Sequence, residues 1–198
     1  MTDLDLAEAK ANMVEQQLRT WEVLNERILD TLERVPREHY ASAKYSNLAY
    51  ADMQIPLGHG QVMLEPKVEG RLLQALDPQP TEKTLEIGTA AGNGTDCLAE
   101  LSAHVTSGEL IPELREQAEH NLQRAGVDNI HLHTGDAARG WSDGRHYDVI
   151  AVTASLPEMH PAFHPSLSMG ARLFLIVGQP PLMEAVLITR VGEDQWAT

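Results

Sequence analysis

The sequence predicts an α/β domain: a doubly wound, mostly parallel sheet that follows an N-terminal helical extension and ends in an antiparallel hairpin. Strand and helix patterns alternate over residues 83–177, helical periodicity precedes them, and a turn signal comes just before the C-terminus. A length of 198 residues with 42% hydrophobic residues suits one domain with a continuous core. We therefore expect a single domain over 1–198, with the extension over 1–80 and the α/β core over 81–198.

The extension is predicted to be mainly helical. Residues 6–20 favour helix, and Asn25 can cap a second helix. The stretch 37–61 is irregular, Pro66 suits the first turn of a third helix, and the Asp-Pro-Gln-Pro run at 77–80 breaks the chain. The apolar faces of the second and third helices are formed by Ile28, Leu29, Leu32, Val35, Leu72, Leu73 and Leu76. The first two helices are expected to form an amphipathic cover over the sheet.

From residue 83 onward the pattern is regular. The expected strands are 83–87, 104–107, 129–134, 147–153, 171–177 and 184–191, and the expected helices are 93–101 and 112–125. The fourth of these strands is almost continuously apolar, as a parallel strand buried on both faces should be. After the sixth, residues 192–194 (Gly-Glu-Asp) signal a hairpin, and only residues 195–198 remain as its partner. We therefore expect a very short last strand or a truncated sheet.

The charge balance excludes several classes of function. Lys and Arg number 15 against 29 Asp and Glu, a formal net charge of −14. Nucleic-acid affinity depends mainly on basic side chains that neutralise phosphates, so neither nucleic acid nor an acidic membrane surface is an expected partner. The N-terminus has no signal-peptide pattern and the chain has no long apolar run, which indicates a soluble cytoplasmic protein. The single cysteine, Cys97, excludes an internal disulfide.

A candidate ligand site lies in the first half of the α/β core. Residues 85–92 (LEIGTAAG) read as a strand, a turn of small residues and a helix start, which lets a ligand approach the backbone at the carboxyl end of a parallel strand. Glu109, 21 positions beyond Gly88, falls at the expected end of the next strand, where a carboxylate can accept both hydroxyls of a ribose. Gly135-Asp136 follows the third strand, where an acid can accept a hydrogen bond from the amine of an adenine. Together these features predict a nucleoside pocket.

The pocket lacks the glycines of a dinucleotide-binding fingerprint and has no nearby Lys or Arg, and these absences indicate which nucleoside it binds. A dinucleotide fingerprint needs glycine at its first, third and sixth positions, and this chain has Gly88, Ala90 and Asn93 there. A nicotinamide-dependent oxidoreductase is therefore disfavoured. Three acids without a nearby Lys or Arg suit a ligand with a cationic centre, such as the sulfonium of S-adenosylmethionine, with Glu86 facing its amino-acid end. The plainer alternative is a small-residue turn with two surface acids in an ordinary Rossmann-like domain.

Over nearly its whole length the chain resembles the protein-L-isoaspartate O-methyltransferases, a family of class I S-adenosylmethionine-dependent methyltransferases. The segments that carry the resemblance are 13–18 (MVEQQL), 34–38 (RVPRE), 49–52 (AYAD), 55–58 (IPLG), 85–92, 135–136 and 147–153. The resemblance implies a Rossmann-like class I methyltransferase sheet, a substrate loop within residues 1–80, and S-adenosyl-L-methionine as cofactor. The cofactor contacts that it implies are Met63, Glu86, Gly88, Thr89, Gly92, Glu109, Asp136 and Ala137.

The resemblance also implies an enzyme that methylates a carboxylate of a damaged protein or peptide, or a related small-molecule acceptor. A carboxyl group of pKa about 4 is already ionised at neutral pH, so alignment and exclusion of water are the main tasks of such a site. One departure falls at the expected catalytic position: the family pattern Thr-Ile-Ser-x-Pro is replaced by residues 62–66, and Leu64 stands in place of the serine. Leu64 has no hydroxyl, and Glu65 beside it would repel a carboxylate if it faced the site. The alternative is a relative that binds the cofactor without this transfer and acts as a binding or regulatory module.

The remaining candidates have plainer interpretations. Thr153 and Ser155 lie at the end of the fourth expected strand, where either hydroxyl could partly replace the missing serine. Gly108 stands where an apolar strand residue is usual, and Cys97 is interpreted as a packing residue. The histidines His59, His131, His133, His160 and His164 are expected to be loop or surface residues, and no metal site is expected. The sequence leaves the oligomeric state open.

Overall fold

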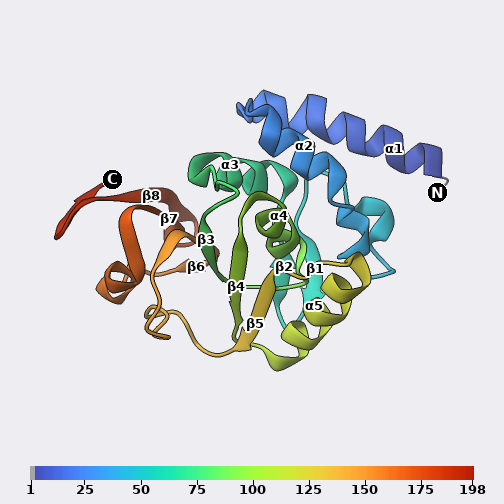
Figure 1. Cartoon of the computed structure of the whole chain (residues 1–198). Helices are drawn as coiled ribbons and strands as arrows, with labels where there is room; N and C mark the ends of the chain where they lie inside the picture. Colours follow the sequence, from blue (N-terminus) through green and yellow to red (C-terminus); the bar gives the residue numbers. More distant parts are fainter. Residues whose placement is uncertain (1–2) are drawn as a thin grey trace.

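A seven-stranded sheet forms the centre of the molecule (Figure 1). The computed structural model describes residues 3–198, and the strand order is β5-β4-β3-β6-β7-β8-β9. The first five strands in this order are parallel, and the last two run antiparallel to their neighbours. The strands are β3 (Lys83–Ile87), β4 (His104–Glu109), β5 (Ile130–Thr134), β6 (Tyr147–Leu156), β7 (Leu167–Gln179), β8 (Leu182–Gly192) and β9 (Gln195–Ala197). The predicted fold class is confirmed, and the final hairpin ends in a strand of three residues.

Helices α3, α4 and α5 cover one face of the sheet, and α2 packs against α3 and α4. Their bounds are α2 (Glu26–Arg34), α3 (Pro66–Leu76), α4 (Asn93–Leu101) and α5 (Pro112–Ala125), and the last two match the predicted helices residue for residue. Leu72, Leu98 and Leu122 join these helices in one buried core with Val149 of the sheet. In the part of the chain that the structure describes, no helix is long and apolar enough to span a membrane.

The opposite face of the sheet is covered less regularly. Phe163, from the 3₁₀ helix η5 (Pro161–Ser166), is fully buried on this face, and Trp141 packs against the same core. The connections that carry these two residues contain no α-helix in the structure. In the connection from β5 to β6, which carries Trp141, Gly140 adopts a positive φ. In the connection from β6 to β7, which carries Phe163, Pro165 removes a backbone donor inside η5.

The N-terminal extension is helical, as predicted, but not uniformly α-helical. The helix α1 (Asp3–Asn12) continues through a π-helical turn, η1 (Met13–Leu18), into a 3₁₀ turn, η2 (Arg19–Trp21). Asn25 then caps α2, because its side-chain oxygen accepts a hydrogen bond from the backbone N–H of Arg27 at 3.0 Å. The predicted cap is therefore confirmed.

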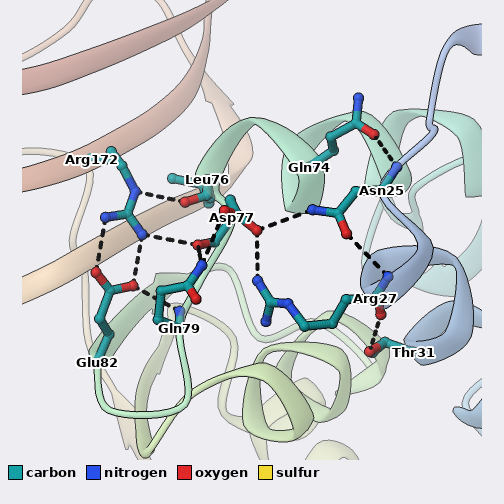
Figure 2. A network of polar contacts seen from close by, with 9 residues as sticks. All are labelled: Asn25, Arg27, Thr31, Gln74, Leu76, Asp77, Gln79, Glu82 and Arg172. Carbon is teal, nitrogen blue, oxygen red and sulfur yellow. Dashed lines mark hydrogen bonds and ion pairs between the residues drawn. The ribbon is translucent and has the colours of Figure 1, made fainter.

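A network of polar contacts joins the extension to the sheet (Figure 2). Asn25 Nδ2 and Arg27 Nη2 both donate to Asp77 Oδ1, at 3.2 and 2.6 Å. From the sheet, Arg172 of β7 donates to the two carboxylate oxygens of Glu82 at 2.9 and 2.7 Å and to two backbone oxygens at the end of α3. The C-terminal end of α3 is thereby held between α2 and the sheet.

The stretch expected to be irregular contains short regular elements. They are η3 (Arg37–His39), η4 (Ser46–Leu48), β1 (Ile55–Gly58) and β2 (Gln61–Met63). The strands β1 and β2 form an antiparallel hairpin whose turn residues, His59 and Gly60, both have positive φ. The expectation of irregular chain is therefore wrong for this hairpin. Strands of four and three residues are too short to show a clear alternating pattern in the sequence.

Candidate active site

A cavity of about 270 Å³ opens at the carboxyl ends of β3, β4, β5 and β6, and β2 forms part of its wall. The predicted site residues that line it are Met63, Leu64, Glu86, Gly88, Thr89, Glu109, Asp136 and Ala137. Gly92 is not among the lining residues: it precedes α4 as its N-cap, and a Cβ there would lie 3.1 Å from the side chain of Leu122. The structure therefore gathers all of the predicted residues except Gly92 around one space, and their contacts with a cofactor stay a prediction.

The turn between β3 and α4 has an unusual backbone geometry. Gly88, Ala90 and Gly92 all adopt positive φ. A Cβ on Gly88 would lie 2.6 Å from Thr153 Oγ1, so a larger residue does not fit there. The N–H of Ala90 donates to Glu109 Oε2 at 2.8 Å, which ties the strained turn to the end of β4.

Glu86, on β3, is buried in the cavity wall. Its Oε2 accepts hydrogen bonds from Thr95 Oγ1 at 2.5 Å and Ser107 Oγ at 2.6 Å. Burial raises the pKa of Glu86 to about 7 against the lowering effect of these two hydroxyls, and the carboxylates of Glu69 and Glu109 add to the rise. Glu86 therefore changes charge near neutral pH, and a cation beside it would favour the ionised form.

The two acids expected to face a nucleoside lie after neighbouring strands. Glu109 is buried at the end of β4, where its Oε1 accepts a hydrogen bond from the N–H of Ile111 at 3.0 Å. Asp136 is exposed just after β5, and its Oδ1 accepts a hydrogen bond from the N–H of Ala138 at 2.9 Å. Each carboxylate oxygen can accept more than one hydrogen bond, so both acids keep capacity for a ligand's donors.

An aromatic residue that the sequence did not single out explains Gly108. The ring of Trp141 lies 3.1 Å from the place that a Cβ of Gly108 would take, and 3.4 Å from the equivalent place at Gly135. The indole therefore occupies the space of an ordinary strand side chain. It packs against the two glycines that precede Glu109 and Asp136.

The expected acceptor side of the cavity is built around a buried guanidinium. Leu64 is half-buried in the cavity wall, and its carbonyl oxygen accepts a hydrogen bond from Arg37 Nη2. Arg37 also donates through Nε to the carbonyl of Ala49 at 2.8 Å and pairs through Nη1 with Glu69 Oε2 at 2.6 Å. Burial raises the pKa of Glu69, whereas Arg37 and Asn93 lower it. One side chain thus ties the end of the β1–β2 hairpin to α3.

Glu69 and Asn93 belong to this site, and neither is among the predicted cofactor contacts. Asn93 Nδ2 donates to both carboxylate oxygens of Glu69 at 2.8 Å, and both residues line the cavity. A signal for Glu69 is present in the sequence, because Glu69 shares helical spacing with the buried Leu72 and Leu73. An acid on an apolar helix face needs a buried partner.

The two hydroxyls at the end of β6 have different surroundings. Thr153 Oγ1 donates to the carbonyl oxygens of Ile87 and Gly88, at 3.0 and 2.7 Å, which commits it to holding the turn after β3. It is therefore not free to replace the missing serine. Ser155 is exposed and lines the cavity, so of the two hydroxyls it is the one that stays a candidate for the role of the serine.

The cysteine and the histidines take structural or surface positions. Cys97 lies on the buried face of α4 and packs into the core, as predicted. His160 caps η5 through a hydrogen bond to its ring, and His164 stacks on Trp196 with ring centroids 4.0 Å apart. The other predicted loop and surface histidines, His59, His131 and His133, are exposed. Among the described residues, no group of three or more His, Cys, Asp or Glu side chains is placed to hold a metal ion.

Comparisons with known sequences identify relatives over most of the chain. The family model described as protein-L-isoaspartate(D-aspartate) O-methyltransferase matches residues 8–196. A protein-L-isoaspartate O-methyltransferase of Aeropyrum pernix is 37% identical over 192 residues, which are 95% of this chain and 74% of the relative. One of Syntrophus aciditrophicus is 36% identical over 185 residues, which are 93% of this chain and 85% of the relative.

Solved structures share the fold. A protein-L-isoaspartate O-methyltransferase superposes with a TM-score of 0.79 at 20% identity, over 91% of this chain and 60% of that one. A Plasmodium falciparum beta-aspartate methyltransferase, solved in complex with S-adenosyl-L-homocysteine, superposes with a TM-score of 0.77 at 19% identity, over 91% of this chain and 89% of that one. The matching family model spans nearly the whole sequence, and both sequence relatives are more than 30% identical over most of their own length. This chain therefore belongs to the protein-L-isoaspartate(D-aspartate) O-methyltransferase family.

Proposed function

We propose that this chain binds S-adenosylmethionine and transfers the methyl group to the side-chain carboxylate of a damaged aspartyl residue in a protein or peptide. The observation that carries the proposal is the chemistry of the cavity. Four acids line it, Glu69, Glu86, Glu109 and Asp136, and no Lys, Arg or His among the described residues does so. This lining fits a ligand with a sulfonium and an ammonium group and disfavours a pyrophosphate. Family membership supports the choice of acceptor.

The residues of the chain have separate tasks in this reaction. Glu109 and Asp136 would hold the nucleoside, and Glu86 would face the amino-acid end. A bound cofactor would supply a methyl group on a positively charged sulfur, for transfer to a carboxylate oxygen with the neutral thioether as the leaving group. An ionised carboxylate needs no general base, so the apolar wall at Met63 and Leu64 serves to exclude water and to align the acceptor.

A cofactor-binding relative without isoaspartyl transfer is the second candidate, and Leu64 favours it. Leu64 provides no hydroxyl, and the guanidinium of Arg37 behind it is already engaged by Glu69 and two carbonyl oxygens. Among the described residues no cation lines the cavity, and Arg37 behind Leu64 is engaged, so no free cation receives the charge of a carboxylate acceptor.

One experiment separates the two candidates. The protein is incubated with methyl-labelled S-adenosylmethionine and either an isoaspartyl peptide or its normal aspartyl counterpart, and calorimetry measures cofactor binding separately. Transfer to the isoaspartyl peptide alone supports the enzyme, whereas binding without transfer supports the second candidate. Asp136→Ala should weaken cofactor binding, and Asp128→Ala, an exposed acid outside the cavity, should not. Absence of binding in the wild-type protein would overturn both candidates.

We also propose that residues 1–80 and 81–198 work as one domain in the cytoplasm. The single-domain proposal is supported by the cavity, whose wall takes residues from both parts, and by the contacts of Arg27 and Arg172 at the end of α3 (Figure 2). The cytoplasmic location is supported by the free thiol of Cys97, which suits a reducing compartment.

A further inference from the structure

The side-chain amide of Asn93 has only one chemically sensible orientation. One of its ends lies 2.8 Å from both carboxylate oxygens of Glu69, and Arg37 holds the same carboxylate in a buried ion pair. A carboxylate paired with a guanidinium accepts hydrogen bonds and does not donate them. The NH₂ group of Asn93 must therefore face Glu69, and its Oδ1 must point the other way.

This orientation leaves a buried acceptor in the cavity wall. Asn93 is 4% exposed, and its Oδ1 receives no hydrogen bond from the described residues. Buried polar atoms are nearly always hydrogen-bonded in folded proteins, so an unpartnered one beside a cavity points to a ligand that supplies the donor. Asn93 lines the same cavity as Glu86.

The surroundings of Asn93 indicate the charge of that donor. A Cβ on the neighbouring residue, Gly94, would lie 2.9 Å from Glu86 Oε1 and 3.5 Å from Glu69 Oε1, so both carboxylates border the same small space. The two hydroxyl donors to Glu86 both bind Oε2, which leaves Oε1 with capacity to accept. A site with these acceptors and a negative field favours a cationic donor such as an ammonium group.

We propose that Asn93 is a specificity-determining residue that accepts a hydrogen bond from the ammonium group at the amino-acid end of the cofactor. Glu69 and Arg37 act as positioning residues, because they hold the NH₂ end of the amide and so keep its oxygen on the side away from Glu69, available to the ligand's donor. The inference rests on the proposed function, in which this cavity holds S-adenosylmethionine. Recognition of the cofactor's amino-acid end then depends on a chain of contacts from Arg37 in the extension through Glu69 to Asn93.

Calorimetric binding of three ligands tests the proposal without any turnover. S-adenosylhomocysteine carries the ammonium group, its analogue without the α-amino group keeps the carboxylate, and 5′-methylthioadenosine lacks the whole amino-acid end. Asn93→Leu keeps the approximate volume of the side chain but removes its acceptor. We expect this variant to lose about tenfold to a hundredfold in affinity for S-adenosylhomocysteine, as for a lost hydrogen bond to a charged group. Its affinity for the other two ligands should stay within about twofold of wild type.

Asn121→Leu is the matched control. Asn121 is a buried asparagine that binds the same turn, through a hydrogen bond from Nδ2 to the carbonyl of Ala91 at 3.0 Å, but it does not line the cavity. Loss of this hydrogen bond should weaken the binding of all three ligands equally. Binding of 5′-methylthioadenosine shows that a variant is folded. If Asn93→Leu does not fold, Asn93→Ala is used in its place.

Two results would overturn this inference and leave the proposed function standing. One is an Asn93 variant that loses affinity equally for all three ligands, and the other is a wild-type protein that binds the deaminated analogue as tightly as S-adenosylhomocysteine. A wild-type protein that binds none of the three overturns the proposed function, and this inference with it. The two failures are thus distinguishable.

Discussion

Replacement of Arg37 by methionine should strongly destabilise the protein. The variant leaves the carboxylate of Glu69 buried without its ion-pair partner, and it removes the donor to the carbonyl oxygens of Ala49 and Leu64. Breaking a buried ion pair by removal of one partner costs about 3–5 kcal/mol. The buried carbonyl of Ala49 and the half-buried carbonyl of Leu64 each lose a donor, at about 1 kcal/mol each, which brings the expected loss to about 5–7 kcal/mol. For a chain of this size the loss corresponds to a fall in Tm of roughly 10–28 °C.

The pH dependence of this loss has a defined sign. Burial already raises the pKa of Glu69, and Arg37 lowers it, so the pKa rises further in Arg37→Met. The cost of burying the charged carboxylate is full above the folded-state pKa and absent below the unfolded-state pKa, which is near 4.3. Relative to wild type, the free energy of unfolding of the variant should therefore be lowest at pH 8 and partly restored at pH 5.

Urea unfolding at pH 5 and pH 8 measures both effects. Arg71→Met is the control, because Arg71 pairs with Glu22 on the surface, with both side chains about half exposed or more. That exposed pair is worth about 0–1 kcal/mol. Two results would contradict this prediction: Arg37→Met unfolds at the same urea concentration as Arg71→Met, or its loss of unfolding free energy relative to wild type is the same at both pH values.

Three further predictions concern the cavity. Leu64→Ser should raise kcat for an isoaspartyl peptide about tenfold, because an orienting hydrogen bond is worth about 1.4 kcal/mol, and Leu64→Ala, which adds no hydroxyl, should not. With the pKa of Glu86 raised to about 7, the affinity of the wild-type protein for the cationic cofactor should rise about tenfold from pH 6 to pH 8, and Glu86→Gln should abolish this rise. Calorimetry at three pH values measures the affinity, and an unchanged wild-type affinity would contradict a role for Glu86 in binding the cation. Gly108→Val should destabilise the fold by about 1–3 kcal/mol and alter tryptophan fluorescence, because the new side chain meets Trp141; an unchanged Tm would show that the indole can move aside.

Local signals account for the parts of the fold that could be predicted. The helix α5 begins at Pro112 and ends before Gly126 because these residues favour a helix start and a left-handed C-cap, and both signals are read within a few positions. Asn25 caps α2 for the same local reason. The β1–β2 hairpin was missed because its two strands are too short to show a period, and its turn depends on positive φ at His59 and Gly60.

The sequence by itself determined the family, the parallel core and the edge of the sheet where the candidate site lies. The sequence predicts that Glu86, Glu109 and Asp136 share one site, because consecutive parallel strands end at the same edge of the sheet. Only the tertiary structure showed that Arg37 meets Glu69, 32 positions away, and that Glu69 holds Asn93, 24 positions further on. The strength of these contacts comes from burial, and burial depends on how the extension, α3 and α4 pack together, which no short stretch of sequence encodes.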